Sequence, residues 1–339
     1  MKNDSTKSKH YYLKTNLQSM LKIKKTLESA NKIAIFWHEN IDWDCIWSML
    51  GLGKLLEKQW KKISYFTPSE PSKIFNFLPD VKKIKTKFDY AKYDLLIFTD
   101  FTGYGRISKF TENKEQYFDN HHLIIIDHHR ENSTPKHALL QKDINSMSAC
   151  EVVFETTYKR RKKYYDQNIA TCLYLWLTTD SGNFRFDQWK QTPILLSNAL
   201  KLVKLWADKK SIIDNVFRTK TFQSIKFMQK VLDRMVQDWN IVYSYYQDSE
   251  LSKYKLDEEE AVYWQFVMQD IMWPDIVVLF KKIWNYIKWS IRSKKTDVSQ
   301  IAQKFWWWWH RNASGFKVDF KWNFNKEIKE IIKKIKTEL

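Results

Sequence analysis

The chain has very little glycine. It contains 6 glycines in 339 residues, whereas average usage of about 7% predicts about 24. The same chain has 17 tryptophans, so the two counts together come close to the expected number of glycines. Trp60 and Trp206 each follow a helical segment, at the position of a left-handed helix cap. Asp238-Trp239-Asn240 and Lys321-Trp322-Asn323 each separate apolar runs, where a glycine-containing hairpin turn fits.

These positions lead to a hypothesis about how the gene is read. The run Trp306-Trp307-Trp308-Trp309 is natural as a glycine-rich loop and unnatural as packed surface. We hypothesise that the source reads the codon UGA as glycine where the printed sequence has tryptophan. The alternative is a truly tryptophan-rich protein, and UGG codons at these positions would establish that alternative.

Cysteine and long apolar segments are also scarce. Cys45, Cys150 and Cys172 are odd in number and lack metal-binding spacing, which favours a reduced intracellular setting. No run approaches the roughly 20 consecutive apolar residues that span a bilayer. Residues 1–14 are polar and contain no apolar core of a signal peptide. We therefore expect a cytoplasmic protein without a membrane partner.

The bulk composition indicates a globular protein with anionic partners. The length is sufficient for two domains, and 44% of the residues are hydrophobic. The net charge of +18 favours polyanions, because lysine and arginine lower the cost of approaching phosphates. A lysine-rich solvated surface is the simpler interpretation of any single lysine run.

The hydrophobic pattern predicts two domains of different class. An opening helix is expected over 16–30, and strands that alternate with helices predict an α/β domain with a mostly parallel sheet over 1–189. A helical connector is expected over 190–235 and a smaller α+β domain over 236–339. The predicted strands are 33–37, 62–66, 95–99, 123–127, 241–246, 261–267, 276–280, 286–292 and 316–320, and the predicted helices are 44–59, 148–164, 168–179 and 297–305, followed by a basic tail at 326–337.

Acidic residues and histidines follow the apolar runs of the first domain. His38, Asp42 and Asp44 come after 33–37, and Asp100 closes 95–99. The tripeptide 127–129, Asp-His-His, closes the run 123–126, and Asp180 closes the apolar run 173–179. Parallel strands end at one edge of a sheet, and ligands of α/β sheets bind there. Six potential metal ligands are therefore expected at one edge: His38, Asp42, Asp44, Asp100, His128 and Asp180.

This ligand set suits two hard divalent ions. Carboxylates and neutral imidazoles favour Mn²⁺, Mg²⁺ or similar ions, and no thiolate is placed to take part. Asp100 suits a bridging position because a carboxylate has two oxygens. Two ions about 3.5–4 Å apart activate a hydroxide for hydrolysis of a phosphoester. A single Asp at a strand end is more often a helix cap. The prediction of a metal site therefore depends on the six potential ligands occurring together.

The motifs resemble those of the DHH phosphoesterase family. With Trp43 and Trp47 read as glycine, residues 38–48 become H-E-N-I-D-G-D-C-I-G-S, which is similar to the family's first motif. The tripeptide 127–129 gives the family its name. Residues 305–315, with glycine at 306–309, become F-G-G-G-G-H-R-N-A-S-G and resemble the signature of the DHH-associated C-terminal domain. Ile41 and Cys45 depart from the family, which often has Pro and Ala there.

The resemblance implies a site and an activity. One Mn²⁺ (or Mg²⁺ or Co²⁺) would be held by His38, Asp42 and Asp100, the other by Asp44, Asp100, His128 and Asp180, with His129 facing the phosphate or leaving oxygen as the catalytic residue. The implied substrate-binding residues are Arg292, Ser293, Trp308, Trp309, His310, Arg311, Ser314 and, less specifically, Arg106.

The implied activity follows from the two-domain plan. The plan is most similar to the group of bifunctional oligoribonucleases and PAP phosphatases (nanoRNases). These enzymes degrade very short RNA to mononucleotides and remove the 3′-phosphate of 3′-phosphoadenosine 5′-phosphate (PAP). Homodimerisation is compatible with the sequence.

Two alternatives stay open. Within the enzyme class, the chain would hydrolyse linear or cyclic dinucleotides such as pApA or cyclic di-AMP. From another class, it would be a nonenzymatic RNA-binding protein that depends on its basic charge. Replacing Asp127, His128 and His129 together by alanine separates these classes. An enzyme would lose hydrolysis and keep its RNA affinity, whereas a nonenzymatic binder would show no hydrolysis even before the replacement.

Overall fold

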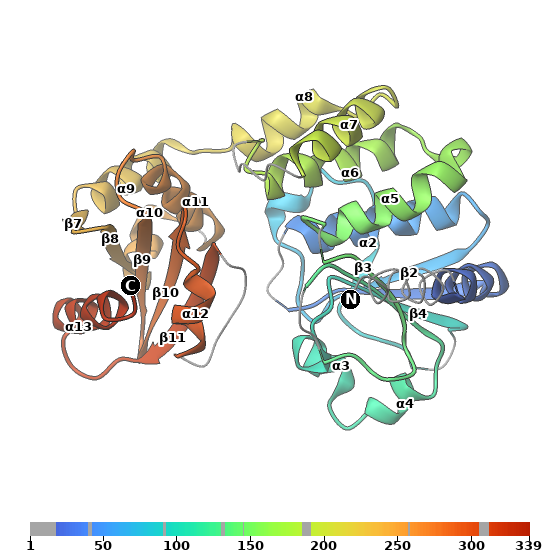
Figure 1. Cartoon of the computed structure of the whole chain (residues 1–339), viewed down its shortest axis with the longest axis horizontal. Helices are drawn as coiled ribbons and strands as arrows, with labels where there is room; N and C mark the ends of the chain where they lie inside the picture. Colours follow the sequence, from blue (N-terminus) through green and yellow to red (C-terminus); the bar gives the residue numbers. More distant parts are fainter. Residues whose placement is uncertain are drawn as a thin grey trace, which may run out of the picture. The chain divides into compact units, whose positions relative to one another are not determined.

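The chain folds into two compact units. The computed structural model describes residues 18–39, 43–90, 93–129, 133–144, 146–184, 191–256, 258–304 and 312–339. The first unit comprises residues 1–218 and the second residues 219–339 (Figure 1). Each unit has its own sheet and its own core, so each is described by itself.

The first unit is built on a parallel sheet in the order β3-β2-β1-β4-β5-β6. Its strands are β1 (Lys32–Phe36), β2 (Lys62–Phe66), β3 (Ile84–Lys85), β4 (Leu95–Thr99), β5 (Leu123–Asp127) and β6 (Leu139–Lys142). The central strands β4 and β5 are buried along their whole length, and apolar up to their last residue, because both faces of the sheet are covered. Ile33 and Ile97 point into one hydrophobic core, and Phe36 and Phe98 into the other.

Helices cover both faces of this sheet. They are a helix described over 18–29, then α2 (Trp43–Glu57), α3 (Ser108–Thr111), α4 (Glu115–Asp119), α5 (Ala149–Arg161), α6 (Gln167–Asp180), α7 (Thr192–Val203) and α8 (Lys209–Ile212). Figure 1 shows α2, α5 and α6 on one face and α3 and α4 on the other. None of the helices in the described ranges combines the length and the apolar character needed to cross a membrane.

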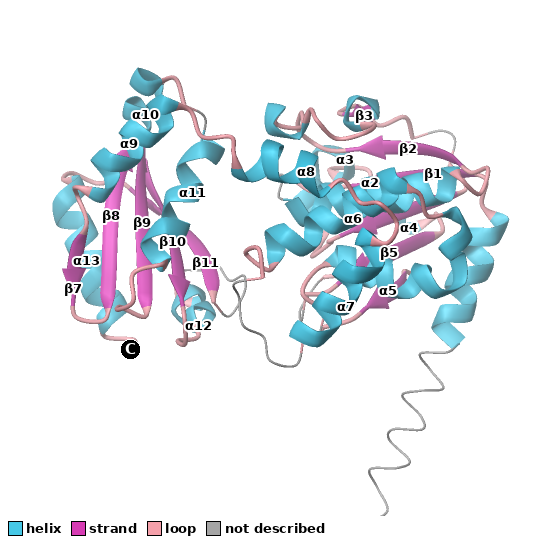
Figure 2. Cartoon of the chain, turned by 90° about the horizontal axis from the view of Figure 1, so that it is seen from above, coloured by secondary structure: helices cyan, strands magenta, loops and turns pink. Residues whose placement is uncertain are grey.

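The second unit is a mixed sheet between two helical layers. The strand order is β11-β10-β9-β8-β7, and only β8 and β9 pair in parallel. The strands are β7 (Val236–Asp238), β8 (Ile241–Gln247), β9 (Ile276–Ile283), β10 (Tyr286–Ser293) and β11 (Ala313–Asp319). The helices are α9 (Phe222–Leu232), α10 (Asp248–Tyr254), α11 (Glu258–Gln269), α12 (Val298–Gln303) and α13 (Phe324–Lys336). One core contains residues of α12 and α13 and the other residues of α9 and α11 (Figure 2).

The predicted fold classes of both units are confirmed, with several local corrections. The predicted strands 62–66, 95–99 and 123–127 match β2, β4 and β5. The predicted strand 261–267 is wrong, because this stretch lies in α11, where Trp264 and Met268 lie one helical turn apart and pack against α9 and β9. Residues 173–179 belong to helix α6, so Asp180 ends a helix and not a strand.

The second half shows two further differences. Residues 190–235, predicted as a connector, supply α7 and α8 to the first unit and α9 to the second. The basic stretch 326–337 lies mostly in α13, whose apolar residues Ile328, Ile331 and Ile335 are buried. Trp322 precedes α13 and therefore does not form a hairpin turn.

A bidentate ion pair joins α10 to the segment after α9. Arg234 donates from Nη1 and Nη2 to the two carboxylate oxygens of Glu250, at 2.8 Å each. Lys230 adds an ion pair of 2.7 Å to the same carboxylate. The hydrogen bonds from Arg234, against the smaller opposing effect of burial, lower the pKa of Glu250 from 4.5 to about 2. The charged form of Glu250 therefore stabilises the folded second unit.

The substitution Glu250→Gln should remove this stabilisation in a pH-dependent way. We expect the free energy of unfolding to fall by about 2 kcal/mol at neutral pH. Because the folded-state pKa is depressed, the contribution is present above pH 4.5 and is lost as the pH falls toward about 2. Urea unfolding of the parent chain and of Glu250→Gln should show that the difference between their free energies of unfolding shrinks as the pH falls through this range.

The control is Asp214→Asn, which removes a partly exposed i,i+4 pair with Lys210. This change should leave the free energy of unfolding nearly unchanged at any pH, because solvent screens an exposed pair. A deficit of Glu250→Gln that is as large at pH 3 as at pH 7 would contradict the role of the ionised carboxylate.

Candidate functional site

Three neighbouring strands of the first unit end beside one another. Because β1, β4 and β5 are adjacent and parallel, their carboxyl ends meet at one edge of the sheet. His38 follows β1, Asp100 follows β4, and Asp127 is the last residue of β5. The expectation that these motifs meet at one edge is met for the described residues.

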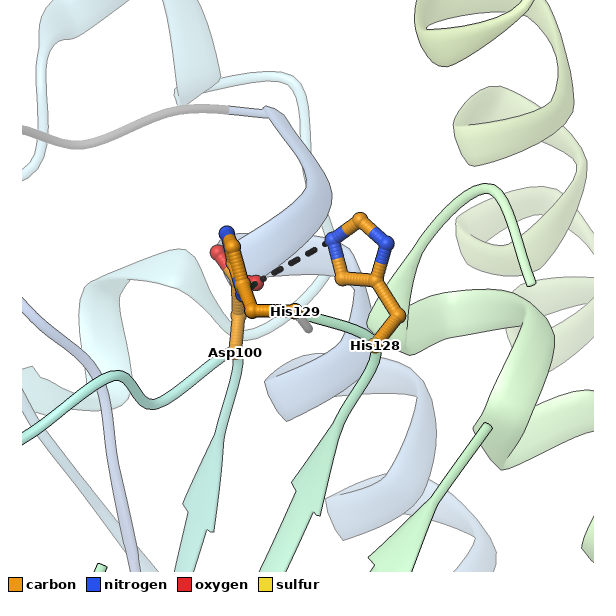
Figure 3. A group of neighbouring side chains, drawn as sticks. All are labelled: Asp100, His128 and His129. Carbon is orange, nitrogen blue, oxygen red and sulfur yellow. Dashed lines mark ion pairs between the residues drawn. The ribbon is translucent and has the colours of Figure 1, made fainter. Parts of the chain in front are cut away.

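Asp100 lies at the centre of this edge. Its Oδ2 is 3.2 Å from His38 Nε2, and its Oδ1 is 3.6 Å from His128 Nε2 and 3.4 Å from His129 Nδ1. Only 5% of the residue is exposed. Figure 3 shows the carboxylate beside the two imidazoles that follow β5. One buried carboxylate thus contacts three histidines from two other strands.

The backbone at Asp100 holds this orientation. Its φ of 55° lies in the left-handed region, which aspartate tolerates better than most residues do. Its amide donates to the carbonyl of Ile126 at 2.9 Å, which continues the pairing of β4 with β5 by one residue. Such conformations concentrate at functional sites, where the surrounding structure maintains them.

His128 is oriented by the backbone behind it. Its Nδ1–H donates to the carbonyl of Ser146 at 3.3 Å. Its Nε2 therefore faces the carboxylates of Asp100, at 3.6 Å, and Asp44, at 3.7 Å. A backbone carbonyl that fixes one ring nitrogen and leaves the other facing acidic groups is the usual environment of a metal-binding histidine.

Asp44 links two helices to this cluster. It lies in the first turn of α2 and is 7% exposed. Its two oxygens accept hydrogen bonds from the amides of Ala149, at 2.7 Å, and Cys150, at 3.0 Å. These are the first two residues of α5, where backbone N–H groups and the helix dipole favour an anion. The carboxylate is held in place and retains lone pairs toward His128.

His129 has a different acidic partner. Its Nδ1–H donates to Asp127 Oδ1 at 2.8 Å. Asp127 is fully buried, and Lys142 Nζ on the neighbouring strand β6 lies 4.0 Å from its other oxygen. The hydrogen bond with Asp127 engages Nδ1 of His129, so Nε2 is the ring nitrogen that can face a reacting group.

The electrostatics of the cluster favour a cation. Burial alone would raise the pKa of Asp100, but its interactions with the imidazoles of His128 and His38 hold that pKa well below its usual range. Burial would lower the pKa of His128, yet Asp100 and Asp44 raise it to about 10. Burial would also lower the pKa of His129, but the hydrogen bond with Asp127 and the charges of Asp100 and Asp127 together raise it. Positive charge is therefore stabilised at this edge of the sheet.

Arg106 lies against His38. Its Nη2 is 2.9 Å from Nδ1 and 3.0 Å from Nε2 of the imidazole, and its carbonyl accepts from the amide of Glu39 at 2.8 Å. Arg106 belongs to a short 3₁₀ turn (Tyr104–Ile107) just beyond Asp100. The sequence predicted Arg106 as a phosphate-binding residue, and the structure places it beside the same edge.

The described residues fit a hard divalent ion. Ligand atoms of Asp100, His128 and His129 all lie within 4.8 Å of one another. Asp100 Oδ1 is buried and has no hydrogen-bond partner in the described part of the chain. Where His38 Nδ1 donates to the carbonyl of Glu39, its Nε2 lone pair faces an Asp100 oxygen. Two lone pairs at such a distance attract only with a proton or metal ion between them.

Two of the predicted ligands are not placed. Asp42 lies outside the described residues. The backbone of Asp180 ends α6, but its side chain is not described. The next turn is unusual, because Gly182, Asn183 and Phe184 all have positive φ values, from 57° to 64°.

In the second unit, three of the predicted substrate-binding residues lie together on β10 and β11. Ile291 pairs with Ser314, and Arg292 pairs with Ala313. Arg292 Nη1 donates to the carbonyls of Ile291 at 3.0 Å and Ser314 at 3.4 Å, while Ser293 Oγ donates to the carbonyl of Thr296 at 2.5 Å. Trp308, Trp309, His310 and Arg311 lie outside the described residues.

Arg292 is a half-buried cation without an acidic neighbour. Burial lowers its pKa to about 10, and none of the described carboxylates forms an ion pair with it. A buried guanidinium normally has an anionic partner. Among the described residues, its environment therefore suits the binding of an anion.

Sequence reasoning missed the groups that hold the cluster in place. Ser146 acts through its backbone carbonyl, which no side-chain pattern reveals. The N-terminus of α5 had a readable signal, because Ser148 and Glu151 have the spacing of a capping box. Ser148 accepts from the Glu151 amide at 3.1 Å, and Glu151 accepts from the Met147 amide at 2.7 Å.

Part of the chain matches a known protein family. Residues 32–175 match the model described as "DHH family, N-terminal domain". The chain is 21% identical over 309 residues to the bifunctional oligoribonuclease and PAP phosphatase NrnA of Mycoplasma genitalium, covering 91% of this chain and 95% of that protein. The protein of the same name from Mycoplasma pneumoniae is 22% identical over 291 residues, covering 85% and 88%.

A solved structure shares the fold. The crystal structure of an exopolyphosphatase-related protein from Bacteroides fragilis superposes with a TM-score of 0.83 at 22% identity, covering 95% of this chain and 96% of that one. Residues 32–175 therefore match the N-terminal domain of the DHH family, and the similarity to the two Mycoplasma proteins over most of their length supports a phosphoric ester hydrolase.

Proposed function

We propose that the protein hydrolyses oligoribonucleotides of a few residues to mononucleotides and removes the 3′-phosphate of PAP. The observation that carries the proposal is the convergence of His38, Asp44 and His128 with the buried Asp100 at one sheet edge. The names and full-length coverage of the two Mycoplasma relatives support the substrate class. The net charge of +18 suits anionic substrates.

The first unit would hold two divalent cations, with Mn²⁺ expected and Mg²⁺ or Co²⁺ as alternatives. One would be bound by His38, Asp42 and Asp100. The other would be bound by Asp44, Asp100, His128 and Asp180. When bound, such a pair supplies a hydroxide at neutral pH and offsets the charge that develops on phosphate oxygens.

The residues of the chain then have separate tasks. Asp100 has both oxygens directed at imidazoles of different strands, which suits a bridging carboxylate. Asp44 and His128 are held by backbone groups, so their ligand atoms keep their places without a bound ion. His129, whose Nδ1–H is held by Asp127 and whose raised pKa favours the doubly protonated ring, would give the proton on Nε2 to the leaving oxygen.

The second unit would bind the substrate through Arg292. A guanidinium is suited to phosphate because it offers several donors in a fixed plane. Ser293 and Ser314, both buried beside Arg292, would fix the position of that phosphate. Trp308, Trp309, His310 and Arg311 would complete this region.

The substitution Asp100→Asn should weaken metal binding. It removes one charge from the carboxylate that contacts three histidines, so we expect the affinity for Mn²⁺ to fall by at least about 100-fold. Isothermal titration of the full chain with Mn²⁺ measures this. Loss of hydrolysis of pApA in the presence of Mn²⁺ should accompany it.

Asp94→Asn is the matched control for this experiment. Asp94 precedes the same strand β4 at its other end, where its side chain accepts from the amides of Asn31 and Lys32. Its replacement should leave Mn²⁺ affinity unchanged. An equal loss of Mn²⁺ affinity in both variants would contradict the proposed metal site. Unchanged Mn²⁺ affinity in Asp100→Asn would contradict it as well.

The substitution Arg292→Ala should weaken substrate binding. A charge-assisted contact with phosphate is worth roughly 1.5–3 kcal/mol, so KM should rise about 10- to 100-fold with a smaller change in kcat. Assays with pApA, a trinucleotide, PAP, cyclic di-AMP and pyrophosphate in parallel would also rank the substrates. We expect the first three to be hydrolysed.

Arg218→Ala is the control, because Arg218 is exposed and pairs with Asp214. An unchanged KM in Arg292→Ala would refute the assigned role of Arg292. Turnover of cyclic di-AMP or pyrophosphate alone would refute the proposed substrates but not the metal site.

A further inference from the structure

Four tryptophans have a backbone conformation that tryptophan rarely adopts. Trp60, Trp206, Trp239 and Trp284 have φ values of 64°, 64°, 54° and 38°, and they are four of the ten non-glycine residues with positive φ in the described ranges. In this region the Cβ atom crowds the backbone, so bulky residues are outliers there. The four side chains are 63–91% exposed, so little tertiary packing compensates for the conformation.

Two of the four end helices in the position that glycine usually fills. The amide of Trp60 donates to the carbonyl of Glu57, and the next amide, of Lys61, donates to Leu56. This pair of bonds defines a Schellman motif, in which the C′ residue is left-handed and usually glycine. Trp206 repeats the pattern after α7.

The amide of Trp206 donates to the carbonyl of Val203 at 2.9 Å, and that of Ala207 donates to Leu202 at 3.2 Å. The hydrogen bonds are therefore the same as at Trp60. Two independent helices thus end in one motif with tryptophan in the glycine position.

The other two tryptophans lie in two-residue hairpin loops. Trp239 and Asn240 join the paired residues Asp238 and Ile241, and Trp284 is the first residue of the loop between β9 and β10. In both loops the first central residue has positive φ and the second does not. This is the pattern of a type II′ turn, whose first central residue is glycine.

Buried tryptophans add an independent observation. Trp37, Trp176 and Trp264 are fully buried, and their indole N–H groups have no hydrogen-bond partner in the described part of the chain. Buried indole groups normally find an acceptor. These positions therefore also lack the environment that a native tryptophan selects.

We infer that the natural protein carries glycine at Trp60, Trp206, Trp239 and Trp284, because its source reads UGA as glycine. The inference is independent of the proposed function, since these four positions lie in helix caps and hairpin loops. It accounts at once for the shortage of glycine, the excess of tryptophan and the four left-handed backbones. The remaining tryptophans are then to be assigned by their codons.

Two direct measurements test the inference. The gene should have UGA at these four codons, and mass spectrometry of tryptic peptides from the natural source should show glycine at the four positions. UGG codons, or peptides with the mass of tryptophan, would overturn the inference.

A stability measurement tests the physical argument separately. Recombinant chains carrying Trp60→Gly or Trp284→Gly should unfold at a higher temperature than the printed chain, by roughly 2–4 °C per substitution. Trp322→Gly is the matched control, because Trp322 is also exposed but is not among the positive-φ residues. The substitution Trp322→Gly should give no gain in unfolding temperature. An equal gain at Trp322, or no gain at Trp60 and Trp284, would contradict the claim that their backbones require glycine.

Discussion

The candidate site depends on one buried carboxylate that lies between imidazoles. Asp100 contacts His38 on one side and His128 and His129 on the other, and it does so from a left-handed backbone at the end of β4. A buried carboxylate is costly unless it is paired. The parallel sheet supplies the pairs, because β1 and β5 flank β4 and end at the same edge.

The rest of the first unit maintains this arrangement. The N-terminus of α5 fixes Asp44 through two amides, and Ser146 fixes His128 through its carbonyl. Asp127 does the same for His129. The cluster is thus preorganised by backbone groups and one buried acid, and its own charges raise the pKa of His128 and lower that of Asp100. Such a cluster has the charge and the geometry to receive cations.

Where motifs follow strands, the sequence indicated which residues the sheet brings together. His38, Asp100 and the tripeptide 127–129 follow short apolar runs, and parallel strands bring the ends of such runs together. The prediction failed where helices and strands share composition. Residues 261–267 are mostly apolar, and tertiary packing makes this stretch helical. The carbonyl of Ser146 that orients His128 left no signal in side-chain spacing, because every residue has a backbone carbonyl.

The most direct test of the account is the position of bound metal. Crystals of the full chain grown with Mn²⁺ should show two anomalous peaks about 3.5–4 Å apart, both within coordination distance of Asp100 and one of them beside His128. The absence of any peak at Asp100, or Mn²⁺ bound only elsewhere on the chain, would contradict it.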